Sequence, residues 1–154
     1  MKFLISLLAI VLITKECNNK NVSESTSLNK KQDLHITIIY KASSRGSFKE
    51  ITVSKDSFSI CNDRNRKDIT YYECTTKDWN ECLALLEKIE VDKLPNLKAP
   101  TSMRQYDGAE HATLTIKNDK EMIQSSTFDH GFPPEEIKAL VEKLLSFNKL
   151  TSKQ

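Results

Sequence analysis

Short runs of alternating apolar and polar residues predict most of the secondary structure of this chain. The first run, residues 34–40, places four apolar side chains on one face: Leu34, Ile36, Ile38 and Tyr40. Its β-branched and aromatic content is typical of a strand. Further strands are predicted at residues 48–53, 57–61, 69–75, 111–117 and 122–128.

The strands at 48–53 and 57–61 are separated by a short polar segment, which predicts a β-hairpin. A two-residue turn at positions 55 and 56 sets Val53 opposite Phe58. The same turn sets Ile51 opposite Ile60. All four side chains then share one face, as a sheet with one buried face requires.

The strands at 111–117 and 122–128 predict a second hairpin, and two registers are open to it. A two-residue turn at Asn118-Asp119 pairs Leu114 with Ile123. A longer turn pairs Ile116 with Met122 instead.

Two stretches have the apolar spacing of amphipathic helices. The first begins near Thr76, a good N-cap residue, with Asp78 in its first turn. Its stripe is Trp79, Cys82, Leu83, Leu86 and Ile89, and we expect the tryptophan to anchor the packing. The second follows Pro133-Pro134, which preset a first helical turn. Its stripe is Ile137, Leu140, Val141, Leu144, Leu145 and Phe147.

The order of these elements is β-ββ-β-α-ββ-α, which predicts an α+β fold. Runs of strands followed by single helices favour an antiparallel sheet of about six strands, with both helices packed on one face. We expect one domain over residues 34–148 and a frayed tail over residues 149–154.

Charge and motif content argue against several classes of function. Charged residues make up 29% of the chain, but the net charge is only +2 and both signs are mixed, unlike the basic stripe of a nucleic-acid-binding protein. The spacings typical of zinc ligands and the glycine-rich loops that bind phosphates do not occur in the sequence. We therefore expect no nucleic acid, metal or small-molecule cofactor.

The N-terminus carries the clearest functional signal. Met1-Lys2 is a short positive segment, and Phe3–Ile13 is almost unbroken apolar sequence. That length fits the core of a signal peptide and is too short to span a bilayer as a helix. The pattern predicts export.

A single cysteine, Cys17, follows the apolar run by four residues. This position resembles the lipid-attachment cysteine of bacterial lipoproteins, although Lys15 and Glu16 stand just ahead of it, where that family has small residues. The resemblance implies a signal peptide over residues 1–17, a membrane anchor through lipid on Cys17, and location in the cell envelope. A soluble secreted or periplasmic form and an uncleaved anchor are the alternatives. Residues 18–33 are polar and aperiodic, which predicts a flexible tether spanning roughly 20–25 Å.

Three further cysteines belong to the predicted domain: Cys61, Cys74 and Cys82. Export makes a disulfide chemically reasonable, and Cys61 and Cys74 lie in consecutive predicted strands. We predict that pair as the disulfide and Cys82 as a buried thiol in the helix stripe. A tight loop at Asn65-Arg66 would instead set Cys61 opposite Thr70.

Polar residues flank the second hairpin at its open end. Asp107, Glu110 and His111 precede its first strand, and Asp129 and His130 follow its second. Carboxylates and histidines brought together in this way can bind a metal or transfer a proton. The other interpretation, which we favour, is that the aspartates bond to turn backbone and the histidines are half-exposed surface residues.

The order of elements also resembles that of emfourins, small protein inhibitors of thermolysin-like metalloproteases. The shared features are a glycine-containing loop after the first strand, a hairpin, a helix, the Leu94-Pro95 linker and a final helix led by two prolines. Emfourins usually carry a Gly-Gly-Phe loop, of which this chain keeps Gly46 and Phe48. The resemblance implies a partner-binding loop that includes Arg45, Gly46 and Phe48. The C-terminal third also resembles small exported bacterial proteins that are often lipoproteins.

Three functional hypotheses follow. The first is an exported, lipid-anchored, non-enzymatic domain that binds a protein or envelope component. The second is an emfourin-like inhibitor of a metalloprotease. The third is a hydrolase that uses the cluster of Asp107, His111, Asp129 and His130.

Overall fold

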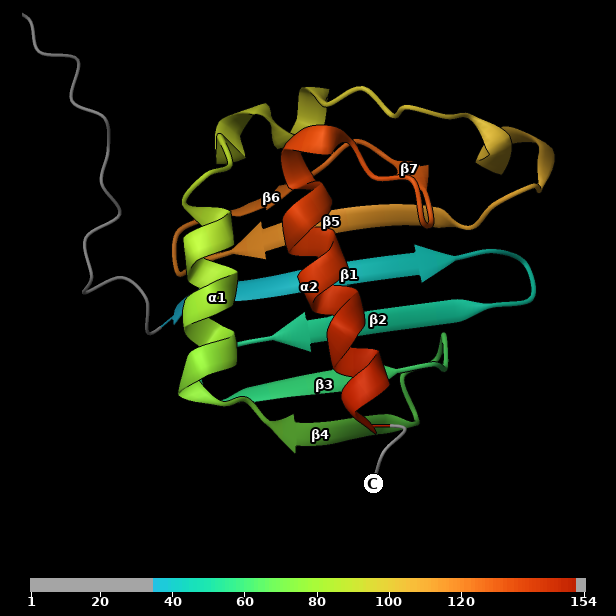
Figure 1. Cartoon of the computed structure of the whole chain (residues 1–154). Coiled ribbons are helices and arrows are strands. Elements are labelled where there is room, and N and C mark those ends of the chain that lie inside the picture. The colour runs from blue at the N-terminus through green and yellow to red at the C-terminus, as the bar shows by residue number, and fades with distance from the viewer. Residues whose placement is uncertain (1–34, 152–154) are drawn as a thin grey trace, which may run out of the picture.

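An antiparallel sheet carries two α-helices on one of its faces in this protein (Figure 1). The structure is a computed structural model that describes residues 35–151. The strands are β1 (Thr37–Ser43), β2 (Phe48–Val53), β3 (Ser57–Cys61), β4 (Ile69–Glu73), β5 (His111–Lys117), β6 (Met122–Gln124) and β7 (Phe128–Asp129). Their spatial order is β4-β3-β2-β1-β5-β6, and β7 also pairs with β5. The predicted α+β class with an antiparallel sheet is confirmed.

The core lies between the sheet and the helices. On the strands, it is filled by side chains at the alternate positions that the hydrophobic pattern predicts to be buried. The largest fully buried side chains on the strands are Ile38, Tyr40, Ile51, Val53, Leu114 and Phe128. The helices contribute Leu86, Ile137, Leu140, Leu144 and Phe147, and Leu94 contributes from the connection between α1 and β5. Trp79 is 3% exposed, which confirms its predicted packing role.

β1 is central in the sheet, and this position explains why the strand begins and ends later in the sequence than predicted. It pairs with β2 on one side and with β5 on the other, and both ladders extend to Ser43. The backbone hydrogen bonds on the two sides therefore carry the strand past Tyr40 into the polar residues 41–43. β4 is an edge strand without such support, and it ends at Glu73 rather than at the predicted position 75.

The first hairpin has the predicted register. Val53 lies opposite Phe58, and Ile51 lies opposite Ile60. The Ser54 amide donates to the Ser57 carbonyl across the two-residue turn.

The second hairpin has neither of the registers considered, because its turn is longer. Ile116 pairs with Ile123, and the turn spans residues 118–121. The Asn118 side chain explains the length, since its Oδ1 accepts from the amides of Lys120 and Glu121 at 2.8 and 2.9 Å. An asparagine that bonds to backbone two and three residues ahead stabilises such a turn.

The predicted strand at 122–128 is interrupted by a bulge at residues 125–127. Gln124 pairs with Thr115 and Phe128 pairs with Ala112, so three residues on one strand face two on the other. The Ser125 hydroxyl accepts from the Leu114 amide at 3.0 Å. The bulge brings the chain into contact with the connection between α1 and β5.

That connection contains two 3₁₀ helices, η2 (Val91–Asn96) and η3 (Met103–Tyr106). The Ser126 amide donates to the Leu94 carbonyl of η2 at 2.9 Å, and its hydroxyl donates to the Leu97 carbonyl. The connection is therefore bonded to the sheet through the bulge.

The helices begin close to the predicted positions. α1 (Thr76–Leu86) is capped by Thr75, one residue before the predicted cap, and the Thr75 hydroxyl oxygen accepts from the Asp78 amide at 3.1 Å. α2 (Glu135–Thr151) starts just after the two prolines, and the Pro134 carbonyl accepts from the Ile137 amide. The helix continues to Thr151, so the described residues after Phe147 are helical.

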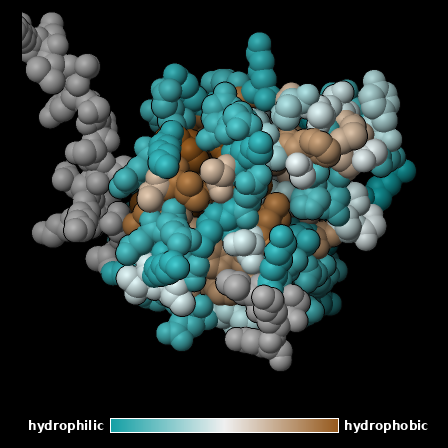
Figure 2. All heavy atoms as spheres, in the orientation of Figure 1, coloured by the Kyte–Doolittle hydropathy of each residue, from teal (hydrophilic) through white to brown (hydrophobic). Residues whose placement is uncertain are grey.

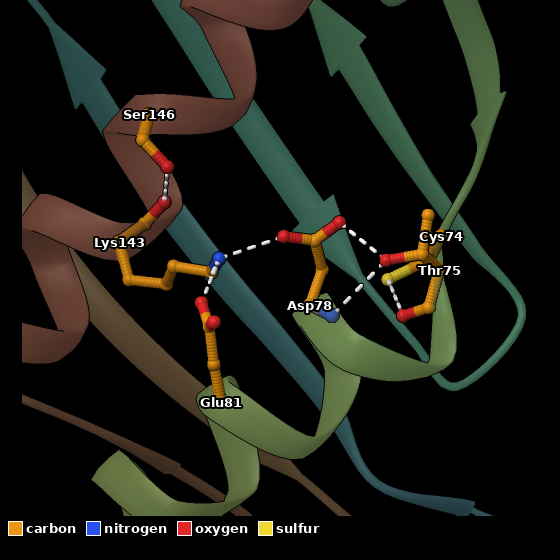
Figure 3. Close-up of polar contacts among 6 residues, drawn as sticks. All are labelled: Cys74, Thr75, Asp78, Glu81, Lys143 and Ser146. Carbon is orange, nitrogen blue, oxygen red and sulfur yellow. Dashed lines mark hydrogen bonds and ion pairs between the residues drawn. The ribbon is translucent and has the colours of Figure 1, made fainter.

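The two helices are joined by Lys143 of α2 (Figure 3). Its ammonium nitrogen lies 2.7 Å from Asp78 Oδ1 and 2.5 Å from Glu81 Oε2 of α1. The hydrogen bond from Lys143 and that from Thr75 hold the pKa of Asp78 below its ordinary value. Partial burial alone would lower the pKa of Lys143, but its two carboxylate partners raise it.

Candidate functional site

A cleft of about 520 Å³ lies at one end of the sheet. Its walls come from the β1–β2 turn, the β3–β4 loop and the segment before β5, all at the right-hand end of the sheet in Figure 1. The lining residues are Ser43, Ser44, Arg45, Arg64, Arg104, Gln105, Asp107, Ala109 and His111. Because three arginines line it, we call it the arginine cleft.

The first wall is the β1–β2 turn, which is held by bonds between its serines. The Ser44 amide donates to the Ser47 carbonyl at 3.0 Å, and the two hydroxyl oxygens lie 2.6 Å apart. Arg64 crosses from the β3–β4 loop and donates to the carbonyls of Ser44 and Ser47. The turn and the loop are thus bonded to each other.

The second wall is the β3–β4 loop, which Asp63 shapes. Its carboxylate accepts from the amides of Lys67 and Asn65 at 3.0 and 3.1 Å, and these bonds hold the pKa of Asp63 below its ordinary value. Arg66 follows with a left-handed backbone at φ 56°, and its side chain pairs with Glu50 at 2.9 Å.

The third wall is the 101–107 segment, which is fixed by the buried Asp129. The carboxylate accepts from Thr101 Oγ1 at 2.5 Å, from the Met103 amide at 2.7 Å and from the Arg104 amide at 3.0 Å. Arg104 Nη1 adds an ion pair at 2.9 Å. Burial opposes ionisation of Asp129, but the hydrogen bonds outweigh it and hold its pKa well below the usual range.

Asp107 ends this segment in a left-handed conformation at φ 57°. The next amide, that of Gly108, donates to the Met103 carbonyl at 2.9 Å. A side chain at position 108 would meet that same carbonyl, because an added Cβ would lie 3.2 Å from its oxygen. Glycine therefore lets the chain turn closely into β5.

The pairing of His111 with Asp129 brings the two predicted polar groups side by side, but their side chains make separate contacts. Asp107 and His111 line the cleft, whereas the Asp129 carboxylate is fully buried and committed to the 101–104 backbone. His130 Nδ1 lies 2.6 Å from the Tyr40 hydroxyl. Burial raises the pKa of that tyrosine, with Glu110 adding to the effect. Within residues 35–151, no group of three or more His, Cys, Asp or Glu side chains is arranged to hold a metal.

The predicted disulfide is not formed. Cys61 pairs with Ile69 at the start of β4, whereas the Cys74 amide bonds to Asp56 beyond the other end of that strand. The five residue steps from 69 to 74 therefore place the Cα atoms of the two cysteines roughly 16 Å apart along the strand, far beyond disulfide reach. All three cysteines of the described chain are free and buried.

Of the predicted partner-binding loop, Arg45 and Gly46 are exposed at the tip of the β1–β2 turn, and Arg45 lines the cleft. Phe48 starts β2 instead, where the Lys41 ammonium lies 5.6 Å from the centre of its ring. Sequence reasoning missed the other cleft arginines, Arg64 and Arg104, because each lies in a separate loop.

Large apolar side chains are exposed at the same end of the molecule. Tyr106 is 82% exposed, Phe132 49% and Met103 38%. Phe132 lies beside the third wall, because its amide bonds to Asp129. In Figure 2, hydrophobic and near-neutral spheres gather over the corner that β7 occupies in Figure 1. We call Met103, Tyr106 and Phe132 the apolar corner.

No protein-family model matches the sequence, and no match was found among curated proteins. None of the helices between residues 35 and 151 is long and apolar enough to cross a bilayer. The predicted signal peptide, Cys17 and the tether lie outside the described residues.

Proposed function

We propose that this protein is an exported, lipid-anchored binding domain without enzymatic activity, and that it binds a protein of the cell envelope. The binding surface is the arginine cleft together with the apolar corner. One observation carries this proposal: the exposed side chains of Arg45 and Arg64 lie at the same end of the sheet as those of Tyr106 and Phe132.

The composition of this surface supports protein recognition. Tyrosine and arginine are enriched among the residues that dominate binding energy at protein interfaces. Burying one large apolar side chain contributes about 1.5–3 kcal/mol, so a partner that covers Tyr106 and Phe132 gains a useful part of its affinity from them. The arginines beside them supply charge and specificity.

The course of β1 suits a domain that is tethered at its N-terminus. The strand begins at Thr37, close to the predicted tether, and ends at Ser43 in the cleft. Its seven residues span about 20 Å. The cleft therefore lies at the opposite end of the sheet from the point where the chain enters (Figure 1), and a membrane anchor on the N-terminal side leaves it accessible.

The contacts that Asp129 and His130 already make favour binding over hydrolysis as the function. A general base needs a free position within hydrogen-bond reach of its substrate. Asp129 is fully buried and already accepts four hydrogen bonds, and His130 is paired with the buried Tyr40. These two members of the cluster serve the packing of the cleft wall.

Inhibition of a metalloprotease is the second candidate. The exposed tip of the β1–β2 turn, with Arg45 and Gly46, favours it, because the element order that resembles emfourins places the partner-binding loop there. Micromolar protein should then inhibit a thermolysin-like enzyme, and Arg45→Glu should weaken the inhibition. Full protease activity at that concentration removes this candidate.

Site-specific crosslinking tests the proposed surface. A photo-reactive phenylalanine analogue replaces Tyr106 in the full chain, made in its native cells. The matched control is Tyr71 on edge strand β4, which is 70% exposed and belongs neither to the cleft lining nor to the apolar corner. We expect a discrete crosslinked product from position 106 and none from 71. Equal products, or none from 106, would refute the surface.

Lipid attachment has its own test. Radiolabelled palmitate should label the wild-type chain and leave Cys17→Ala unlabelled. A membrane-free wild-type protein with an unmodified Cys17 would remove the anchor from the proposal without affecting the binding surface.

A further inference from the structure

We propose that the arginine cleft binds an oxyanion, a carboxylate or phosphate group carried by the ligand. This inference rests on the proposed function in taking the cleft as the binding surface. It adds the chemical class of the group that the cleft recognises.

The charge balance of the cleft points to an anion. Arg64 donates only to the neutral carbonyls of Ser44 and Ser47. Arg45 is exposed at the turn, and no carboxylate of residues 35–151 forms an ion pair with either guanidinium. Two unneutralised arginines therefore face one lining carboxylate, that of Asp107.

Arg104 provides the contrast within the same cleft. Asp129 neutralises its charge at 2.9 Å, and only 14% of the Arg104 side chain is exposed. Its role is to hold the third wall in place. The remaining positive charge is thus concentrated on the side of the cleft formed by the β1–β2 turn and the β3–β4 loop.

The geometry also favours binding of a planar or tetrahedral oxyanion. A guanidinium presents parallel N–H donors that match two oxygens of a carboxylate or phosphate. Arg45 can present such a pair, whereas Arg64 donates to two carbonyls through Nη2 and offers its Nη1 and Nε donors with little further loss of side-chain entropy. A volume of about 520 Å³ is in the range of small-molecule sites, so the cleft has room for the group that carries the anion.

Backbone strain marks the same place. Within residues 35–151, the non-glycine residues with positive φ are Arg66 and Asp107, and they lie in the two loops that form the second and third walls. Strained conformations of this kind cluster at ligand-binding sites.

Nuclear magnetic resonance titration of the full chain in detergent tests the inference. The probes are inorganic phosphate and citrate, with sodium chloride at matched ionic strength as the control. We expect saturable shifts of the cleft amides with millimolar affinity for at least one probe and none with chloride. Saturation by phosphate alone assigns a phosphate-bearing ligand, and saturation by citrate alone assigns a carboxylate.

Substitutions at Arg45 identify the site. This side chain is exposed and bonds to nothing in the described chain, so its variants should fold normally. We expect Arg45→Gln to weaken binding at least threefold and Arg45→Glu to abolish it. The same changes at Lys55, in the turn at the other end of the sheet, should leave binding unchanged. Circular dichroism checks that every variant is folded.

Two results would overturn the inference: no saturation with either probe, or equal losses from the Arg45 and Lys55 variants. Crosslinking at Tyr106 without oxyanion binding would leave the proposed function standing and remove this inference. Oxyanion binding without any crosslinked partner would support this inference and remove the proposed protein partner.

Discussion

Replacing Asp129 with asparagine should destabilise the domain more than any conservative surface change. The side chain is fully buried and accepts hydrogen bonds from Thr101, Met103 and Arg104. Asparagine has the same shape but only one acceptor oxygen, and its amide nitrogen would face N–H donors. The Arg104 guanidinium would also lose its counter-charge.

The magnitude follows from these contacts. Removing one partner of a buried ion pair costs about 3–5 kcal/mol. Arg104 keeps a hydrogen bond to the Thr101 carbonyl at 2.8 Å, and 14% of its side chain remains exposed to water. Both features reduce the loss, so we expect a decrease of about 2–4 kcal/mol in the free energy of unfolding.

Urea denaturation at pH 7 measures this value, with fluorescence of the lone buried Trp79 as the signal. The matched control is Asp68→Asn in the exposed β3–β4 loop, which should change stability by no more than about 0.5 kcal/mol. A cost below about 1 kcal/mol for Asp129→Asn would contradict the role assigned to this carboxylate.

The pH dependence gives a second check. Because the pKa of Asp129 is lowered in the folded state, its stabilisation is present above the unfolded-state pKa of about 4 and is lost as the pH falls below it. The difference between wild type and Asp129→Asn should therefore shrink by about 1 kcal/mol between pH 7 and pH 3. A constant difference would show that folding does not lower the pKa of this carboxyl group.

Three further changes have defined outcomes. Lys143→Met should lower stability at pH 7 by about 1 kcal/mol, because it leaves two α1 carboxylates without their cation, and the loss should fade near pH 3 in thermal melts. Gly131→Ala should lower the free energy of unfolding, measured in urea, by about 1–2 kcal/mol because φ at this position is +87°. Gly46→Ala is the control and should leave stability nearly unchanged. Equal losses from the two variants would contradict the backbone argument. Burial raises the pKa of Cys82 to about 12, so Ellman's reagent at pH 8 should label Cys82 only after denaturant is added, and rapid labelling of native protein would show that the helix opens.

The elements that were predicted well are those with local determinants. The hairpin of β2 and β3 follows from alternation around a short turn, and α1 follows from its spacing and cap. The register of β5 with β6 was missed because one side chain, Asn118, lengthens the turn. The bulge was missed because Ser125 and Ser126 are compatible with a strand, and their reason for leaving it is a distant bond to Leu94.

The cleft was only partly predictable, since its walls are brought together by the strand order. Arg45 was singled out by the resemblance to emfourins, whereas Arg64 lies in a charged loop with no motif to distinguish it. Once the antiparallel order is known, the end of β1, the end of β3 and the start of β5 must share one end of the sheet. Asp107 and His111 both line the cleft, whereas Asp129 is fully buried and has a structural role.

The bonds of Ser126 and Asp129 to the connection between α1 and β5 have a consequence for how this protein can change through evolution. Ser126 forms a hydrogen bond to η2, and Asp129 accepts hydrogen bonds from residues 101–104. The position of the connection depends on these two sets of bonds. Gln105 lines the cleft beyond them and is exposed, so it contributes little to the core. Its side chain can vary and alter what is bound while the domain keeps its stability.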